Sequence, residues 1–172
     1  MLDDLKVIHE RDAQDALGIA EKEWQQLGHK FEVTQEQVGA ENIAYAGMGG
    51  SALAAQMSLT WPGYDRPFEI VRGYDVPEYV SDKTYFIASS YSGNTEETLS
   101  AIAQAAEHGA QIAVITSGGK LAEIAREKQY PLALLPSGLQ PRHAVFYNFT
   151  ALMVLLQKAG LLIKDMNGLQ TA

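Results

Sequence analysis

A run of hydroxyl side chains stands where an apolar segment gives way to a helical pattern. Ser90, Ser92 and Thr95 place three hydroxyls within six residues, directly after the apolar residues 85–88. From Leu99 onward, apolar residues recur at helical spacing. A strand, a loop and a helix in this order direct backbone N–H groups and the positive end of the helix dipole toward the loop. The pattern predicts an anion site, and we expect the anion to be a phosphate monoester.

The charge of the neighbouring sequence agrees with this prediction. Between Lys83 and Lys120 there is no lysine or arginine, so neutral donors would hold the anion. The simpler alternative is that Ser92 or Asn94 only caps the helix. One cap needs one hydroxyl or amide, which leaves the rest of the cluster unexplained and favours the phosphate site.

A glycine-rich loop follows an earlier apolar segment. Residues 47–52 read Gly-Met-Gly-Gly-Ser-Ala, which fits the dinucleotide fingerprint G-x-G-x-x-A. A nicotinamide site also needs an acid at the end of the next strand, where residues 71–72 read Val-Arg. We favour another use of this loop, in which Gly49 and Gly50 let the backbone approach a small ligand and Ser51 donates to it.

Arg142 is the cation that we expect near these loops. It ends an irregular loop, residues 136–142, that follows the last apolar segment. A guanidinium there can stabilise charge that develops on a substrate oxygen, although an exposed, solubilising arginine is the alternative. The adjacent His143 is either an acid–base group or a structural residue at a helix start. Repulsion from a phosphate predicts that Glu96 and Glu97 point away from it, so neither is assigned as a catalytic base.

These residues need a scaffold in which strands alternate with helices. Nearly continuous apolar runs predict strands at residues 43–47, 68–71, 84–89, 111–116 and 132–135. Helical patterns predict helices at residues 3–29, 52–61, 95–108, 121–128 and 143–160. This alternation is typical of an α/β fold with a parallel sheet covered by helices on both faces. Ligands bind such sheets at the carboxyl ends of the strands, where the candidate loops lie.

Composition and charge exclude several classes of function. The chain has 172 residues, no cysteine and a net charge of −8, which argues against disulfides, cysteine zinc sites, nucleic acid and anionic membranes. Its four histidines lack metal-ligand spacing, so we expect no metal. We find neither a signal-peptide pattern nor an apolar stretch of the ~18 residues that a membrane span needs. The sequence predicts a cytoplasmic protein of one domain.

Four segments resemble one known family, the sugar isomerase (SIS) domains. They are residues 47–51 (Gly-Met-Gly-Gly-Ser), 89–98 (Ser-Ser-Tyr-Ser-Gly-Asn-Thr-Glu-Glu-Thr), 116–119 (Thr-Ser-Gly-Gly) and 136–142 (Pro-Ser-Gly-Leu-Gln-Pro-Arg). The pattern S-x-S-G-N-T-x-E-T is typical of SIS domains. The last loop, followed by Phe146, is similar to the N-terminal half of the bifunctional phosphoglucose/phosphomannose isomerases.

The resemblance implies a single SIS domain over residues 1–172, with a five-stranded parallel sheet of the flavodoxin-like kind in three layers. It implies no cofactor. The residues expected to hold a sugar phosphate are Gly49, Gly50, Ser51, Ser90, Ser92 and Thr95. By the same resemblance, Arg142 stabilises the enediolate formed as a proton moves between C1 and C2.

One departure from the family bears on catalysis. Such isomerases carry two SIS domains in one longer chain, and the glutamate, histidine and lysine that move protons lie in the second. Here the matching positions would fall beyond Ala172. We therefore expect the phosphosugar-binding half of an isomerase that converts glucose 6-phosphate or mannose 6-phosphate to fructose 6-phosphate. A phosphosugar-binding or regulatory module without catalysis is the alternative, and an NAD-dependent oxidoreductase is third.

The sequence also predicts association. Trp24, the apolar face of the helix at 3–29 and the apolar helix at 143–160 offer more hydrophobic surface than one sheet needs for cover. We expect a two-fold homodimer.

Overall fold

Five parallel strands form the centre of the molecule. The computed structural model describes residues 4–162. The strands are β1 (Asn42–Gly47), β2 (Phe68–Val71), β3 (Thr84–Ser89), β4 (Gln111–Thr116) and β5 (Leu132–Leu134). They pair in the order β2-β1-β3-β4-β5, all in parallel. Every residue of β3 is buried, as expected for a strand covered on both faces.

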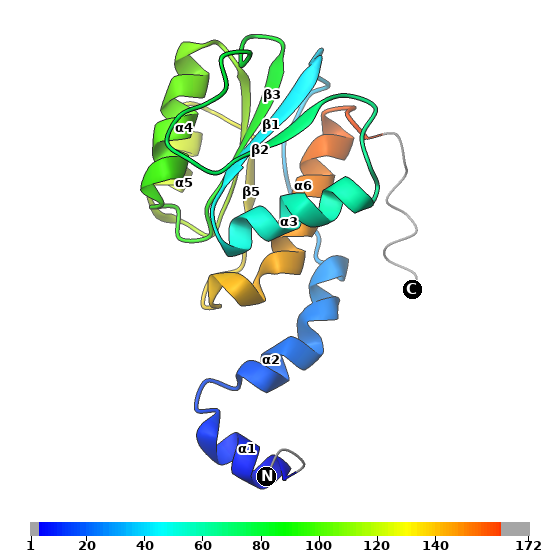
Figure 1. Ribbon diagram of the computed structural model, residues 1–172, viewed down its shortest axis with the longest axis vertical. Helices are drawn as coiled ribbons and strands as arrows, with labels where there is room; N and C mark the ends of the chain where they lie inside the picture. The colour runs from blue at the N-terminus through cyan, green and yellow to red at the C-terminus, as the bar shows by residue number, and fades with distance from the viewer. Residues whose placement is uncertain (1–3, 163–172) are drawn as a thin grey trace.

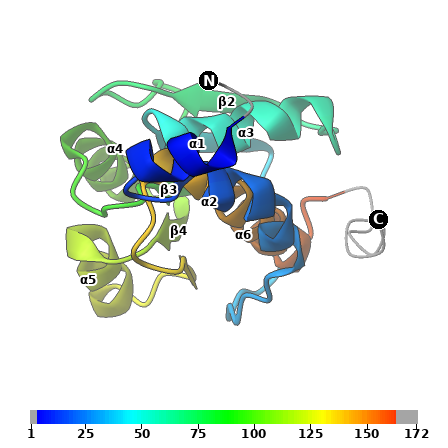
Figure 2. The ribbon, with the colours of Figure 1, turned by 90° about the horizontal axis from the view of Figure 1, so that it is seen from below.

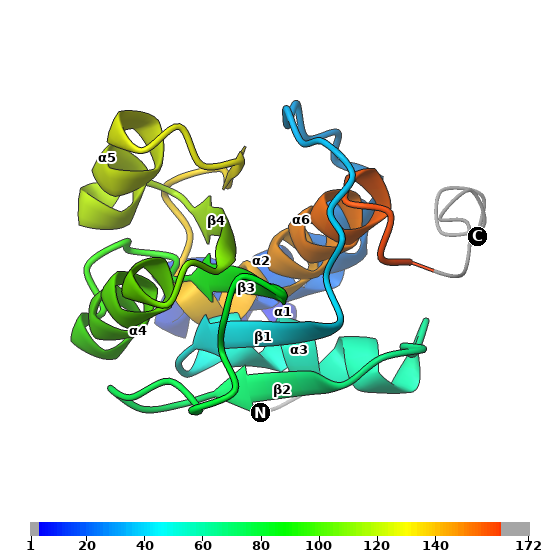
Figure 3. The same ribbon diagram turned by 90° about the horizontal axis from the view of Figure 1, so that it is seen from above.

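Helices cover both faces of this sheet, as predicted (Figure 3). On one side lie α3 (Gly50–Thr60) and α6 (Val145–Lys158), and on the other lie α4 (Glu96–Glu107) and α5 (Gly119–Glu127). Alternate residues of β1 enter different cores: Tyr45 packs in the cluster that contains α6, and Ala44 and Ala46 pack in the cluster that contains α4. The expected three-layer α/β fold is therefore confirmed.

The element boundaries agree closely with the predictions. Each predicted strand is present, to within one residue at its ends. Two helices, α3 and α5, begin two residues earlier than predicted, directly at Gly50 and Gly119. The predicted helix at 143–160 divides into a 3-10 turn, η2 (Pro141–His143), and α6. These differences matter for the site, because helix N-termini stand closer to the strand ends than predicted.

The continuous helix predicted at residues 3–29 is wrong. The described part of it consists of α1 (Leu5–Arg11), α2 (Ala16–Lys22) and a 3-10 segment, η1 (Glu23–Gly28). Asp12 causes the break, because its carboxylate accepts hydrogen bonds from the backbone N–H of Ala16 (2.9 Å) and of Leu17 (2.8 Å) and so caps a new helix. The last of these segments ends at Gly28, one residue before the predicted end, and residue 3 lies outside the described residues.

The first two helices project from the domain. Figure 1 shows α1 and α2 extending beyond the end at which α6 begins, and Figure 2 shows them in front of that end. Neither helix buries a residue. We call residues 5–24 the N-terminal arm. Over residues 4–162, no helix is both long and apolar enough to cross a bilayer.

Candidate phosphosugar site

The site is built where the strand order reverses. The chain leaves β1 to one side and β3 to the other, which opens a crevice beyond their carboxyl ends. The register places Gly47 opposite Ser89, so the glycine loop and the hydroxyl loop start side by side. They are bonded directly, because the backbone N–H of Tyr91 donates to Ser51 Oγ at 3.2 Å. The structure thus brings together the two loops that the sequence singled out.

The hydroxyls of the second loop form one cluster. Ser90 Oγ lies 2.7 Å from Thr95 Oγ1 and 3.5 Å from Ser92 Oγ, and it accepts a hydrogen bond from Gly93 N at 3.1 Å. Ser90 is 2% exposed, whereas Ser92 is open to solvent. The cluster therefore runs from the buried loop outward to the surface.

The helix-capping alternative does not account for this cluster. The N-cap residue of α4 is Thr95, and its side chain makes no capping bond. Ser92 Oγ accepts from Asn94 N within the loop, at 3.3 Å. Asn94 Oδ1 accepts from Lys120 N at 3.1 Å and so caps α5 instead. Because the Thr95 side chain does not cap α4, an anion at the start of this helix could bind its first N–H groups and the positive end of its dipole directly.

Close backbone contact holds the loop after β3 against the loop after β4. Gly93 has φ +70°, and a Cβ placed on it would stand 1.8 Å from the carbonyl oxygen of Gly118. Only glycine fits such a position, for both steric and conformational reasons. The Gly93–Asn94 segment of the sequence motif therefore has a structural role.

Arg142 lies next to the glycine loop. A Cβ on Gly50 would stand 2.9 Å from the carbonyl oxygen of Pro141 and 3.2 Å from Arg142 N, so the η2 turn touches the start of α3. The Arg142 side chain is exposed. The structure thus places the backbone of Arg142, the predicted cation, against the start of α3 at the glycine loop.

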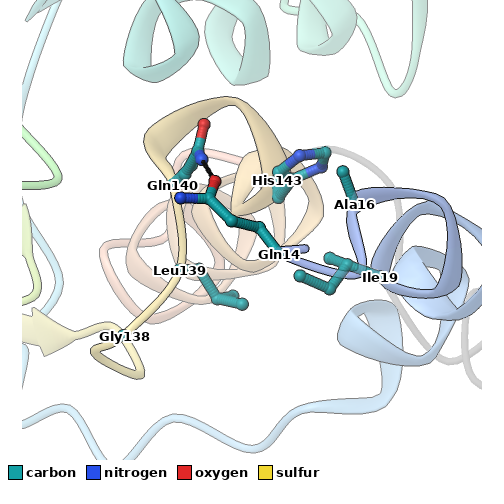
Figure 4. A pocket seen from close by; sticks show the side chains of 7 residues that line it. All are labelled: Gln14, Ala16, Ile19, Gly138, Leu139, Gln140 and His143. Atoms are coloured by element: carbon teal, nitrogen blue, oxygen red, sulfur yellow. Dashed lines mark hydrogen bonds between the residues drawn. The ribbon is translucent and has the colours of Figure 1, made fainter. Parts of the chain in front are cut away.

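His143, in the same turn as Arg142, is bonded to the N-terminal arm. Its Nδ1 lies 2.9 Å from Glu23 Oε1, and its side chain is 12% exposed. It also lines a cavity of about 320 Å³ between the N-terminal arm and residues 138–143, with Gln140 bonded to Gln14 across it (Figure 4). This contact favours the structural alternative for His143.

The acids at the start of α4 are grouped with Tyr74. The Tyr74 hydroxyl donates to Glu96 Oε2 at 3.4 Å. The charge of Glu97, with smaller effects from burial and Glu96, raises the pKa of Tyr74 above its ordinary value. Both carboxylates therefore lie near the segment after β2.

A buried polar network supports the two loops from below, and sequence reasoning missed it. Tyr45 Oη donates to Ser51 O at 2.8 Å and lies 2.9 Å from Asn148 Oδ1 of α6. Asn148 Nδ2 in turn donates to Ser89 Oγ at 3.0 Å. Burial raises the pKa of Tyr45 far above its ordinary value, so the phenol stays neutral. The available signal was a single asparagine among the apolar residues of the last helix.

No metal centre is present in the described part of the chain. Across residues 4–162, His, Asp and Glu side chains nowhere gather in a group of three that could hold an ion. The candidate ligands of an anion are instead hydroxyls, backbone amides and one guanidinium.

A doubly wound α/β domain with a candidate anion site at its switch point is the class that this fold defines. The chain belongs to the SIS domain family, whose sequence profile matches residues 38–161. That match contains β1 through α6 and all four loops at the crevice.

Relatives of known name cover most of this chain. It is 41% identical over 140 residues to a bifunctional phosphoglucose/phosphomannose isomerase of Caldicellulosiruptor bescii, a match that covers 80% of this chain and 41% of the relative. It is 46% identical over 121 residues to a D-glucosamine-6-phosphate 4-epimerase of Sulfolobus acidocaldarius, covering 70% and 39% respectively. The chain thus spans about two fifths of these relatives.

A solved structure supports the fold. The Vibrio vulnificus NanR protein, complexed with ManNAc-6P, superposes with a TM-score of 0.55 at 16% identity. The match covers 91% of this chain and 62% of NanR.

Proposed function

We propose that this chain is the phosphosugar-binding half of an aldose–ketose isomerase acting on glucose 6-phosphate, mannose 6-phosphate and fructose 6-phosphate. The observation that carries the proposal is the hydroxyl cluster at the start of α4, in a loop that the backbone of Tyr91 bonds to Ser51 at the switch point. In this proposal the phosphate is held by Gly49, Gly50, Ser51, Ser90, Ser92 and Thr95. The helix dipole and the hydroxyl donors supply the stabilisation without a cation in either loop.

The proposed role of Arg142 is to stabilise charge on the substrate oxygens. Its turn touches the glycine loop, and its side chain is exposed. Moving a proton between C1 and C2 makes an enediolate whose negative charge a nearby guanidinium stabilises in the transition state. Transfer of that proton also needs a base within hydrogen-bond reach of the carbon. Within residues 4–162 we identify no such base at the crevice, since His143 pairs with Glu23.

The names of the relatives agree on the class of ligand but differ in the reaction. The similar proteins include both isomerases and an epimerase, and their names share a phosphorylated sugar. We therefore propose a hexose 6-phosphate as the ligand. A phosphosugar-binding module without catalysis is the second candidate, and it is favoured by the lack of an assigned base.

Calorimetry with fructose 6-phosphate tests the phosphate site. Ser92→Ala or Thr95→Ala is expected to weaken binding by about 1.5–3 kcal/mol, the range for a hydrogen bond to a charged group. Thr60→Ala is the control, because this exposed hydroxyl bonds Met57 O at the far end of α3. Unchanged affinity in both site variants, with the fold intact, would remove the assignment.

A dehydrogenase-coupled assay tests the reaction. We expect the 172-residue chain to bind fructose 6-phosphate without converting it to glucose 6-phosphate at an enzymatic rate. In a protein extended by a second SIS domain, Arg142→Met should lower turnover more than it weakens binding, because the charge acts chiefly in the transition state. Turnover by the chain alone that disappears in His143→Ala would move the base to this domain.

We also propose a homodimer in the cytoplasm. Three large apolar side chains of the N-terminal arm are exposed: Leu5, Leu17 and Trp24. By contrast, α6 buries eight of its residues within its own domain, which removes it from the expected association surface. The arm is therefore the surface that we propose for contact with a second copy.

A further inference from the structure

Tyr91 stands in the middle of the hydroxyl loop, yet it is 8% exposed. Its phenol Oη donates to Pro136 O at 2.9 Å and accepts from Leu139 N at 2.9 Å. Its backbone N donates to Ser51 Oγ, and its backbone O accepts from both N and Oγ of Ser117, at 3.0 and 2.6 Å. One residue thus bonds to the segments that follow β1, β4 and β5 while belonging to the segment that follows β3.

The phenol has a distinct part in this arrangement. The backbone bonds of Tyr91 can persist whatever its side chain, but the bonds to Pro136 and Leu139 require the hydroxyl. Those two residues lie at the two ends of a short loop that leads into the η2 turn. Without the hydroxyl, a carbonyl and an N–H in a partly buried loop would lose their partner.

We propose that Tyr91 is a positioning residue that sets the place of Arg142 relative to the phosphate-binding loops. The inference rests on the proposed function for the identity of the ligand. Tyr91 couples the segment after β5 to the hydroxyl loop, and Pro141 touches Gly50 from the other side. The turn carrying Arg142 is therefore held between the two loops that would hold the phosphate. Such positioning matters because small misplacements of a charged group cost much of its effect.

Hydrogen exchange on the ligand-free chain tests the positioning directly. In Tyr91→Phe, we expect the Leu139 amide to exchange at least about tenfold faster, because it loses its acceptor. Tyr85→Phe is the matched control: the Tyr85 hydroxyl is also part-buried and bonds Gln35 Oε1 at 2.9 Å, at the opposite end of β3. It should leave the Leu139 amide unchanged. Equal exchange of that amide in Tyr91→Phe and the wild type would overturn the proposal.

Binding separates positioning from general damage. Tyr91→Phe should change the affinity for inorganic phosphate by less than about twofold, while weakening fructose 6-phosphate about as much as Arg142→Ala does. The double variant, Tyr91→Phe with Arg142→Ala, should bind fructose 6-phosphate no more weakly than the worse single variant, because both substitutions remove the same interaction. Additive losses, or an equal loss for inorganic phosphate, would overturn the role. If the wild-type chain does not bind fructose 6-phosphate, the proposed function fails, and the exchange of Leu139 alone decides whether Tyr91 holds the turn.

Discussion

The loops at the switch point are irregular but partly buried, whereas the N-terminal arm is helical but mostly exposed. The loop after β3 is irregular, yet Ser90 and Tyr91 are only 2% and 8% exposed. The arm consists of regular helices, yet Leu5 is 63% exposed and Leu17 is 50% exposed. Helical hydrogen bonds alone do not bury a segment.

The partners of each region explain the difference. The loop after β3 bonds to residues far away in the sequence, as Tyr91 does to Ser51 and to Leu139. In the arm, Asp12 bonds to the nearby amides of Ala16 and Leu17. Two arm side chains also make long-range bonds, Gln14 with Gln140 and Glu23 with His143, but the first is exposed and the second is only part-buried. Short helices held by local bonds are marginal in water, whereas buried long-range bonds are lost only when the domain opens. The comparison shows that order at the site comes from tertiary contacts.

The largest effect is expected where the loops approach most closely. Gly93→Ala would place a Cβ 1.8 Å from Gly118 O at a positive φ. We expect a loss of about 3–5 kcal/mol in the free energy of unfolding, from backbone strain and overpacking together. Urea unfolding measures it. Gly63→Ala, at φ +77° with nothing within 4 Å, isolates the backbone cost and should lose only about 1–2 kcal/mol.

The buried network below the loops should show the next largest effect. Asn148→Leu removes the partner of Tyr45 and Ser89 and is expected to cost about 2–3 kcal/mol of stability. Thr150→Val is the control on the same helix, because its hydroxyl bonds Phe146 O one turn back at 2.8 Å and reaches Gln26 O only at 3.4 Å. Thermal unfolding compares the two variants. A larger loss for the threonine would show that the network contributes little.

The arm should respond in association rather than in folding. Trp24 is 64% exposed, and Trp24→Glu is expected to weaken dimerisation by about tenfold or more, through lost apolar burial. Sedimentation at tens of micromolar, roughly where modest interfaces still form, measures it. Leu59→Glu, at a 49% exposed position on α3, should leave the dimer intact. A monomeric wild-type chain would contradict the proposed association.

The smallest effect is expected at the break in the arm. Backbone N–H bonds from Leu17 and then Ala16 hold the pKa of Asp12 below its ordinary value. Because the folded pKa is lowered, this stabilisation is present above the unfolded pKa of about 3.9 and is lost as pH falls through the folded pKa. The amide shifts of Ala16 and Leu17 should follow that titration. Asp12→Asn, which lacks the charge, should abolish it.

Local pattern predicted most of the scaffold. Apolar runs such as residues 84–89 and 111–116 marked the strands, because a strand covered on both faces has few polar residues. The same reasoning failed at residues 3–29, where apolar spacing continued across Asp12. Helical periodicity does not reveal that one carboxylate will cap a new helix.

Residue types likewise predicted which loops would meet, but not how they are held together. The hydroxyls at Ser90 and Thr95 stand out in the sequence because their spacing follows a strand and precedes a helix. The sequence did not reveal the roles of Asn148 and Tyr91. Asn148 bonds Tyr45, 103 residues away, and Tyr91 bonds Leu139, 48 residues away.

The sequence by itself determined the fold class, which loops carry the hydroxyls and glycines, and the presence of a cation after the fifth strand. These follow from local composition and periodicity, which act over a few residues. Only the tertiary structure decided that Tyr91 binds the loop leading to Arg142, that His143 pairs with Glu23, and that α1 and α2 project from the domain. Each of these depends on which groups the packed fold brings together, and the spacing of residues along the sequence does not reveal which distant groups will be neighbours in space.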